Sequence, residues 1–351
     1  MKPTHLLFSL LLVAALAAAN PVYAAKPRVV VLATGGTIAS LQSSSGLHVA
    51  GAVNVRQLMS AVPQLKELAD VSGEDVVNIG SQDMTNEIWL KLARRLNEVL
   101  GQPDVNGVVI THGTDTMEET AYFLNLVMKS DKPVVMTGSM RTPTALGADG
   151  PANLFDAVEV AADPQAKGRG VMVVMNGQVH YARDVTKQNS MRLDAFQSPN
   201  RGPAGLVAEG HVALFARPIV RYGLGSEFAL ADVTELPRVE IFYAYANMGR
   251  EAIDNAVQRG VKGIVIAGVG NGDMTHIAIE GLTEAVKQGV AVVRSSRIIS
   301  GAVAPNVEVD DNARGFVASM ELNPQKARVL LMLGLTKTND ARKLQELFFQ
   351  Y

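Results

Sequence analysis

The 351-residue sequence contains no cysteine. This excludes a thiol nucleophile and a disulfide framework, so the fold must depend on core burial and on contacts between subunits. With 48% hydrophobic and 19% charged residues, the chain can bury a substantial core, and its length suggests two domains.

The sequence also lacks an excess of charge of either sign. Its formal net charge is -2, and the basic residues are scattered rather than gathered in a stripe. Proteins that bind nucleic acid present a basic patch to the phosphates, so a nucleic-acid partner is not expected. None of the six histidines forms an H-x-x-x-H or H-E-x-x-H pair, so no metal site is predicted, and His112 is interpreted as a structural partner in its loop.

The longest apolar stretch, Leu6 to Ala19, lies near the start of the chain. It follows Lys2 and precedes small residues at Val22 and Ala24, which is the three-part order of a secretory signal. The stretch is shorter than the ~20 residues of a spanning helix, which favours a cleaved signal over an uncleaved membrane anchor. We therefore expect a signal peptide at residues 1–24, export of the mature protein, and no membrane attachment after cleavage.

After this segment, short β-branched runs alternate with segments of helical periodicity. This pattern predicts a mainly parallel sheet covered by helices. The expected strands are residues 28–32, 76–79, 107–111, 133–136 and 171–175, and the expected helices are 86–100, 116–128 and 153–162. Thr116 and Glu119 stand at capping-box spacing at the start of the second helix.

Periodicity is lost at residues 217–238, which are rich in glycine and proline and are interpreted as a linker. An N-terminal catalytic domain at 26–216 and a smaller α/β domain at 239–351 are expected on either side of it. In the second domain, strands are predicted at 239–243, 263–267 and 291–294, and a helix at 323–335.

Polar loops follow the predicted strands. They read "ATGGT", "GSQDM", "THGTDT", "TGSMR" and "NGQVHYARDVTK", and their main charged residues are Asp83, Asp115, Asp184 and Lys187. Because ligands bind outside the carboxyl ends of parallel strands, these loops should line one polar pocket suited to a small zwitterion. "ATGGTIAS" lacks the spacing of a phosphate-binding loop. The better candidate for a dinucleotide site is "AGVGNGD" in the second domain, but the strand after it leads to "RSSR" rather than to a ribose-binding acidic residue, which argues against such a site.

The chemistry predicted for this pocket is attack by a hydroxyl group. G-x-S-x-G is absent, so a serine triad of that kind is not predicted. A buried lysine held neutral and oriented by an aspartate can activate a hydroxyl nucleophile. Lys187 and Asp115 are the pair that this reasoning selects.

Two segments carry a resemblance to a known family: "VLATGGTIA" at residues 31–39 and "GVVITHGTDTM" at 107–117. With "NIGSQDM", "RDVTK", "YANM" and "LNPQKARVLL", they make the chain similar to bacterial exported type II L-asparaginases and glutaminase-asparaginases over nearly all of the mature chain. The resemblance implies a two-domain α/β fold, with a larger N-terminal domain built on a mainly parallel sheet and a smaller flavodoxin-like C-terminal domain. It also implies hydrolysis of L-asparagine to L-aspartate and ammonia, without cofactor or metal.

The resemblance assigns roles residue by residue. Thr37 would be the nucleophile that forms an acyl-enzyme, and Lys187 would accept a proton through the Thr114 hydroxyl, with Asp115 beside them. Ser81 and Gln82 would hold the α-carboxylate and amino ends of the substrate, and Asp115 would pair with its α-ammonium. Backbone N–H groups near Thr37 and Thr114 would stabilise the oxyanion, and Gly36 and Gly113 would let the backbone approach the substrate.

The resemblance further implies a periplasmic homotetramer, a dimer of dimers, with sites between subunits. Glu308 would reach into the neighbouring site. The sequence departs from the family at Asp273, where relatives usually carry Asn or Ser near the substrate amino group, and at His48, which takes the place of a lid tyrosine. His48 either replaces that tyrosine as the activating group or leaves lid-assisted activation weak.

Two alternatives remain. The first is a dual enzyme that also hydrolyses L-glutamine. Ser139 is a small residue expected at the amide end of the pocket, so the sequence does not exclude this alternative. Glutamine is one methylene longer than asparagine, and one methylene changes binding by only ~1–3 kcal/mol. The second, from another class, is an exported amino-acid binding protein without catalysis. The presence of Thr37, Thr114, Asp115, Lys187 and Glu308 argues against it.

Overall fold

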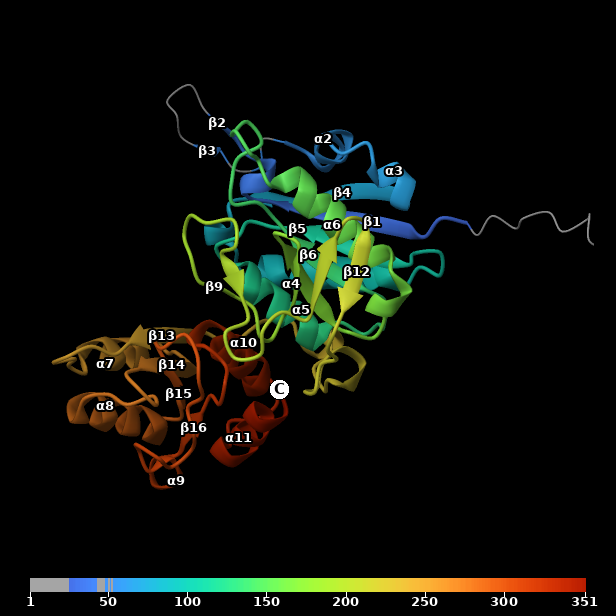
Figure 1. The fold of residues 1–351 in the computed structure, drawn as a ribbon. Coiled ribbons are helices and arrows are strands. Elements are labelled where there is room, and N and C mark those ends of the chain that lie inside the picture. Colours follow the sequence, from blue (N-terminus) through green and yellow to red (C-terminus); the bar gives the residue numbers. More distant parts are fainter. Residues whose placement is uncertain (1–24, 43–47, 50, 52) are drawn as a thin grey trace, which may run out of the picture.

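The structure is a computed structural model that describes residues 25–42, 48–49, 51 and 53–351. The predicted signal peptide, residues 1–24, lies outside the described residues. Figure 1 shows two lobes, one from the first two thirds of the chain and one from the last third. Within the described ranges, no helix is long and apolar enough to cross a bilayer.

The N-terminal lobe is built on an eight-stranded sheet of order β12-β11-β8-β7-β6-β5-β1-β4. The five strands β7, β6, β5, β1 and β4 are parallel, which confirms the expected type of sheet. Their bounds are Arg28–Gly35 (β1), Asp70–Ile79 (β4), Gly107–Thr111 (β5), Val134–Thr137 (β6) and Val171–Met175 (β7). The remaining three are antiparallel: Gln178–Tyr181 (β8), Gly205–Ala208 (β11) and His211–Leu214 (β12).

Alternation along the strands separates two cores. Val30 and Leu32 of β1 point to the face covered by α4 (Asn86–Leu100) and α5 (Met117–Val127). Val29, Val31 and Ala33 point to the opposite face, against α2 (Val55–Ser60), α3 (Leu65–Leu68) and α6 (Gly150–Ala162). A sheet covered on both faces explains why its strands are continuously apolar in sequence.

The capping box expected at Thr116 is wrong. Thr116 does stand at the N-cap of α5, but its side chain makes no capping hydrogen bond. Its hydroxyl donates instead to the carbonyl oxygen of Ser81, at 2.7 Å. The Thr116 side chain therefore connects its own loop to the loop of Ser81 and does not cap helix α5.

The C-terminal lobe contains a four-stranded parallel sheet with strands in sequence order. Its elements are Val239–Tyr243 (β13), Glu251–Gln258 (α7), Gly263–Gly268 (β14), His276–Lys287 (α8), Ala291–Ser296 (β15), Asp311–Arg314 (α9), Phe316–Ala318 (β16), Pro324–Leu335 (α10) and Ala341–Gln350 (α11). Ile264 and Ile266 pack toward α7 and α8, whereas Val265 and Val293 pack toward α10. Among the described residues, 215–238 contain only two short 3-10 turns, Gly223–Gly225 and Leu230–Asp232.

Helix α10 joins the two lobes. It contacts strands β13, β14 and β15 on one side and α5 of the N-terminal lobe on the other. Leu330, Leu331 and Leu333 are fully buried, and one apolar cluster includes both these residues and Phe123 of α5. A helix that buries apolar residues against elements on two sides lies within a core. The two lobes therefore share a hydrophobic core around α10.

Candidate active site

The loops that end β1 and β5 meet at the carboxyl edge of the parallel sheet. Gly36 has φ +84°, and its N–H donates to the Ile79 carbonyl at the end of β4, at 2.9 Å. A Cβ atom on Gly36 would lie 2.4 Å from both the N and Cα atoms of Gly113. Only glycine satisfies both the positive φ and this approach, so the two signature segments are in direct backbone contact.

A third loop packs against the other side of Gly113. A Cβ atom there would lie 2.6 Å from Ser81 Oγ, which also accepts a hydrogen bond from the Asp115 N–H at 3.2 Å. Ser81 belongs to a 3-10 turn, Ser81–Asp83, that follows β4 directly. The loops after β1, β4 and β5 therefore form one compact block, as the sequence predicted from their positions after strands.

Lys187 reaches this block from a small separate hairpin. It ends β9 (Thr186–Lys187), which pairs antiparallel with β10 (Phe196–Gln197). Its Nζ donates to Thr114 Oγ1 at 2.8 Å and to Asp115 Oδ1 at 2.7 Å. The lysine side chain is only 15% exposed, whereas that of Asp115 is 64% exposed. The structure thus brings together the lysine, threonine and aspartate that the sequence selected, with the carboxylate open to an incoming ligand.

Thr37 lies at the start of a 3-10 turn, Thr37–Ala39, immediately after Gly36. Ile38 and Ala39 are buried in the core, and the N–H and hydroxyl of Ser40 both donate to the Thr37 carbonyl, at 3.0 and 2.8 Å. Thr37 itself remains partly exposed. The turn fixes the backbone of Thr37 directly after Gly36, the residue that packs against the Gly113 loop.

Gln82 and Ser139 differ in accessibility. Gln82 is exposed, and its Nε2 donates to Asp83 Oδ2 at 3.2 Å. Ser139 is fully buried, and its hydroxyl donates to the Arg141 carbonyl at 2.8 Å. Its hydroxyl is therefore engaged within its own loop.

Asp273 and Glu308 lie in the C-terminal lobe. Asp273 follows β14, and Glu308 is exposed in the segment between β15 and α9. No hydrogen bond or ion pair between described residues joins either one to Thr37, Ser81 or the Lys187 group.

Arg294 organises the two loops that carry Asp273 and Glu308, a role that sequence reasoning missed. It is fully buried in β15 and forms a two-point ion pair with Asp311, at 2.6 and 2.7 Å. Its remaining donors reach the carbonyls of Asn271, Gly272 and Ala304. The one available signal was "VVRSS", an arginine inside an otherwise apolar strand, since a buried charge requires partners.

His48 and His112 are the two histidines closest in sequence to the signature segments. The His48 backbone belongs to β3 (His48–Val49), paired with β2 (Leu41–Gln42), but its side chain lies outside the described part of the structure. His112 is completely buried, which lowers its pKa to about 4 and keeps it neutral. Its Nδ1 lies 2.7 Å from the Gly113 carbonyl, so Nδ1 carries the proton. This contact agrees with a structural part for His112 in the loop.

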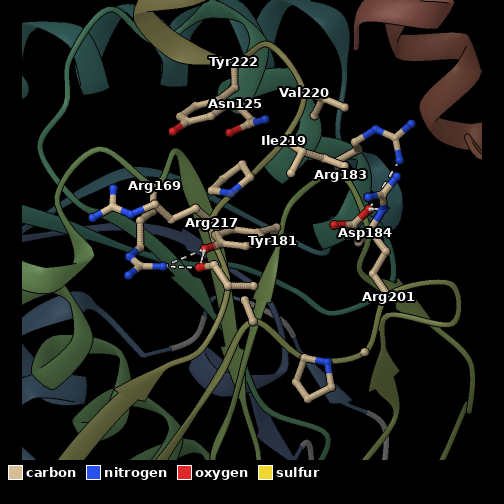
Figure 2. Close-up of a pocket in the computed structure, with 15 residues that line it drawn as sticks. Asn125, Arg169, Tyr181, Arg183, Asp184, Arg201, Arg217, Ile219, Val220 and Tyr222 are labelled. Atoms are coloured by element: carbon tan, nitrogen blue, oxygen red, sulfur yellow. Dashed lines mark hydrogen bonds and ion pairs between the residues drawn. The ribbon is translucent and has the colours of Figure 1, made fainter.

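A separate cavity of about 320 Å³ lies away from this cluster (Figure 2). Arg169 and Arg217 stand on one side of it and Arg183 and Arg201 on the other. Arg169 is engaged by the Tyr181 hydroxyl, and Asp184 forms ion pairs with Arg183 and Arg201. The cavity contains none of the residues Thr37, Thr114 and Lys187, so it is not the candidate active site. The described part of the chain also contains no cluster of three metal-ligating side chains.

Comparisons with known proteins identify the family of this chain. The family model described as "Asparaginase, N-terminal" matches residues 28–220, and "Glutaminase/Asparaginase C-terminal domain" matches residues 238–348. The "L-asparaginase 2" of Escherichia coli (strain K12) is 50% identical over 329 residues, covering 93% of this chain and 94% of that protein. This two-lobed α/β protein with threonine-bearing loops at the edge of its sheet belongs to the asparaginase family.

Other relatives carry different names. The "Probable L-asparaginase periplasmic" of Haemophilus influenzae is 48% identical over 324 residues, covering 92% of each chain. The "Glutaminase-asparaginase" of Pseudomonas fluorescens biotype A is 46% identical over 327 residues, covering 92% of this chain and 90% of that protein. The family thus includes proteins named for one amide substrate and proteins named for two.

Proposed function

We propose that this protein hydrolyses L-asparagine to L-aspartate and ammonia through an acyl-enzyme on Thr37. The observation that carries the proposal is the contact of Lys187 with both Thr114 and Asp115, in the loop that packs against Gly36 and so against the turn bearing Thr37. The names of the relatives support the substrate class.

In the proposed reaction, Thr37 Oγ forms a bond to the amide carbon of the substrate. Its proton passes toward Lys187 through the Thr114 hydroxyl, and the C–N bond breaks as the leaving nitrogen takes a proton to become ammonia. Water then hydrolyses the ester and frees Thr37. Backbone N–H groups of the converging glycine loops stabilise the oxyanion, since preorganised donors are strongest where charge develops. No cofactor or metal is needed for these steps.

Substrate recognition is assigned to the rim of the same block. The exposed Asp115 carboxylate pairs with the α-ammonium, Ser81 and Gln82 hold the carboxylate and amino ends, and Ser139 lies behind the amide end. The pocket excludes glutamine only weakly if one methylene changes binding by ~1–3 kcal/mol. We therefore propose hydrolysis of L-glutamine as a second activity of the same site.

We further propose that the mature protein is a periplasmic homotetramer, a dimer of dimers. The predicted signal peptide and the name of the Haemophilus relative support export to the periplasm. The exposed Glu308, together with Asp273 of the same lobe, would complete a neighbour's site.

The experiment that tests the proposed function measures ammonia release from L-asparagine and L-glutamine by the purified mature chain and by Thr37→Ala. Release that disappears in the variant is the expected result, and the ratio of the two rates gives the selectivity. Binding of either amino acid without release by the wild-type chain would favour the amino-acid binding protein instead.

A further inference from the structure

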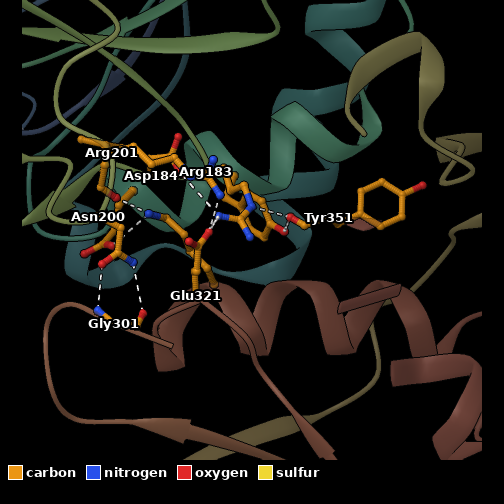
Figure 3. A network of polar contacts seen from close by, with 11 residues as sticks. Arg183, Asp184, Asn200, Arg201, Gly301, Glu321 and Tyr351 are labelled. Carbon is orange, nitrogen blue, oxygen red and sulfur yellow. Dashed lines mark hydrogen bonds and ion pairs between the residues drawn. The ribbon is translucent and has the colours of Figure 1, made fainter. Parts of the chain in front are cut away.

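The five residues Arg183–Lys187 lead to the site lysine, and contacts from the C-terminal lobe hold them. Arg183 Nη1 donates to Glu321 Oε2 at 3.0 Å, and Arg183 Nε donates to the backbone oxygen of Tyr351 at 2.7 Å. Lys326 Nζ donates to the carbonyl of Val185. Figure 3 shows Arg183, Asp184 and Arg201 gathered around Glu321, next to helix α10.

The next residue, Thr186, is held by a buried carboxylate. Its hydroxyl donates to Glu118 Oε1 at 2.9 Å. The other carboxylate oxygen, Glu118 Oε2, accepts from Asn323 Nδ2 at 2.8 Å and lies 3.6 Å from Lys326 Nζ. Glu118 and Lys326 are 4% and 2% exposed. Glu118 also belongs to the first turn of α5, immediately after the loop that carries Thr114 and Asp115.

The strand that carries Lys187 has little support of its own. Its sheet has two strands of two residues each and is not part of the eight-stranded sheet. Such a small hairpin is at best marginally stable alone. By contrast, Glu118 and Lys326 form a buried charge pair whose hydrogen bonds are satisfied. Separating the two side chains would leave a buried charge without a partner, so the pair favours one arrangement.

We propose that the C-terminal lobe positions Lys187 of its own chain. The segment Arg183–Lys187 is held on the side of the C-terminal lobe by three positioning residues: Glu321, Asn323 and Lys326. Glu118 connects this segment to the start of α5, so that lysine, threonine and aspartate keep their distances. The proposal deepens the proposed function and rests on it for the catalytic part of Lys187.

Two substitutions each remove a hydrogen bond to Glu118 and should leave the fold intact. Asn323 also caps α10, since its Oδ1 accepts from the Lys326 N–H at 3.0 Å. Asn323→Ser therefore keeps a good N-cap and loses the Nδ2 donor to Glu118 Oε2 and to Thr186 Oγ1. Thr186→Val keeps the shape and loses the hydroxyl, and Thr186→Ser restores it. Asn200→Ala is the matched control, because Asn200 also joins the two lobes, by hydrogen bonds to Gly301 at 2.8 and 3.2 Å, but makes no hydrogen bond to residues 183–187.

The measurement is kcat and KM for ammonia release, together with amide hydrogen exchange of a peptide covering residues 180–188. We expect kcat to fall about tenfold or more in Asn323→Ser and Thr186→Val with KM little changed, since a small misplacement of a reacting group costs up to about a hundredfold. Exchange of this peptide should become faster in both variants. Thr186→Ser and Asn200→Ala should keep the wild-type values.

An unchanged kcat in both variants would overturn the proposal, whether or not exchange becomes faster. An equal loss of kcat in Asn200→Ala would also overturn it, since any contact between the lobes would then suffice. Should the wild type release no ammonia from either amide, the proposed function fails. In that case, hydrogen exchange of residues 180–188 alone tests whether the C-terminal lobe holds this segment. Exchange as slow in Asn323→Ser and Thr186→Val as in the wild type would refute the positioning role.

Discussion

Gly36 shows how one residue can determine the geometry of a site. Its positive φ turns the chain away from β1, and its missing side chain lets the loop lie against Gly113. The sequence predicted a polar loop at "ATGGT", but it did not predict that Gly113 lies on the other side of Gly36. The sequence predicted that both loops lie at the same edge of the sheet, but not that β1 and β5 are neighbouring strands, which places Gly36 against Gly113.

Gly36→Ala should therefore destabilise the protein and abolish activity. A Cβ atom 2.4 Å from backbone atoms forces the two loops apart, and we expect the free energy of unfolding to fall by about 3 kcal/mol, as for other severe core changes. Gly168→Ala is the control, because Gly168 has φ +70° but no atom within 4 Å of an added Cβ. It should lose only about 1–2 kcal/mol from backbone strain. Urea unfolding of both variants measures the difference, and equal losses would contradict the contact.

Lys187 is the single side chain on which the proposed chemistry depends most. Lys187→Met keeps the length of the side chain but removes the charge and the donor to Thr114, so kcat should fall by about a hundredfold or more. Lys167→Met removes an exposed ion pair with Asp131 and should leave kcat unchanged. Circular dichroism of both variants verifies folding. A Lys187→Met enzyme with wild-type kcat would eliminate the lysine from the mechanism.

Elements differ in how well periodicity predicts them. Strands β5 and β7 and helix α4 have the bounds predicted from sequence, because each is a long or strongly patterned apolar segment. The hairpin from β7 to β8 was missed, although Asn176 and Gly177 have φ of +52° and +71°, and Asn-Gly is the strongest short signal for such a turn. The capping box at Thr116 failed for a different reason: a tertiary partner, the Ser81 carbonyl, is invisible to local patterns.

Helix α5 should make stability depend on pH in a definite direction. Burial raises the pKa of Glu119 to about 7, and Arg328 opposes this only partly. The folded protein therefore binds a proton that the unfolded chain releases between about pH 4.5 and pH 7, so this group's contribution to stability is lost as the pH rises through that range.

Glu119→Gln keeps a neutral side chain at every pH and should remove that loss. Unfolding in urea at pH 4.5, 6 and 7.5 is the measurement. The variant should gain stability relative to the wild type as the pH rises. A constant difference between the two proteins across the three pH values would contradict the raised pKa.

The whole molecule raises the question of where a complete site is formed. The cluster around Lys187 lies in one lobe, whereas Asp273 and Glu308 lie in the other and, among the described residues, share no hydrogen bond or ion pair with it. Sequence reasoning could name these residues through the family resemblance. It could not show that α10 and Arg294 fix the two lobes and their loops, because those contacts depend on packing between distant segments.

Mixed oligomers test whether sites are shared between subunits. Thr37→Ala and Glu308→Gln should each have low activity as pure proteins. Coexpressed, they should regain part of the wild-type activity, because some sites then combine an intact Thr37 from one subunit with an intact Glu308 from another. Light scattering should show the mass of a tetramer for each. A mixture no more active than the average of the pure variants would show that Thr37 and Glu308 of different subunits do not form a site together.

The proposed mechanism depends most on Thr37 as the nucleophile. The direct measurement is mass spectrometry of enzyme quenched with acid during turnover of L-asparagine, followed by mapping of the modified peptide. We predict an aspartyl ester on the peptide containing Thr37, absent when Thr37→Ala is treated in the same way. Rapid turnover without any covalent adduct, or an adduct on a different residue, would contradict the acyl-enzyme mechanism.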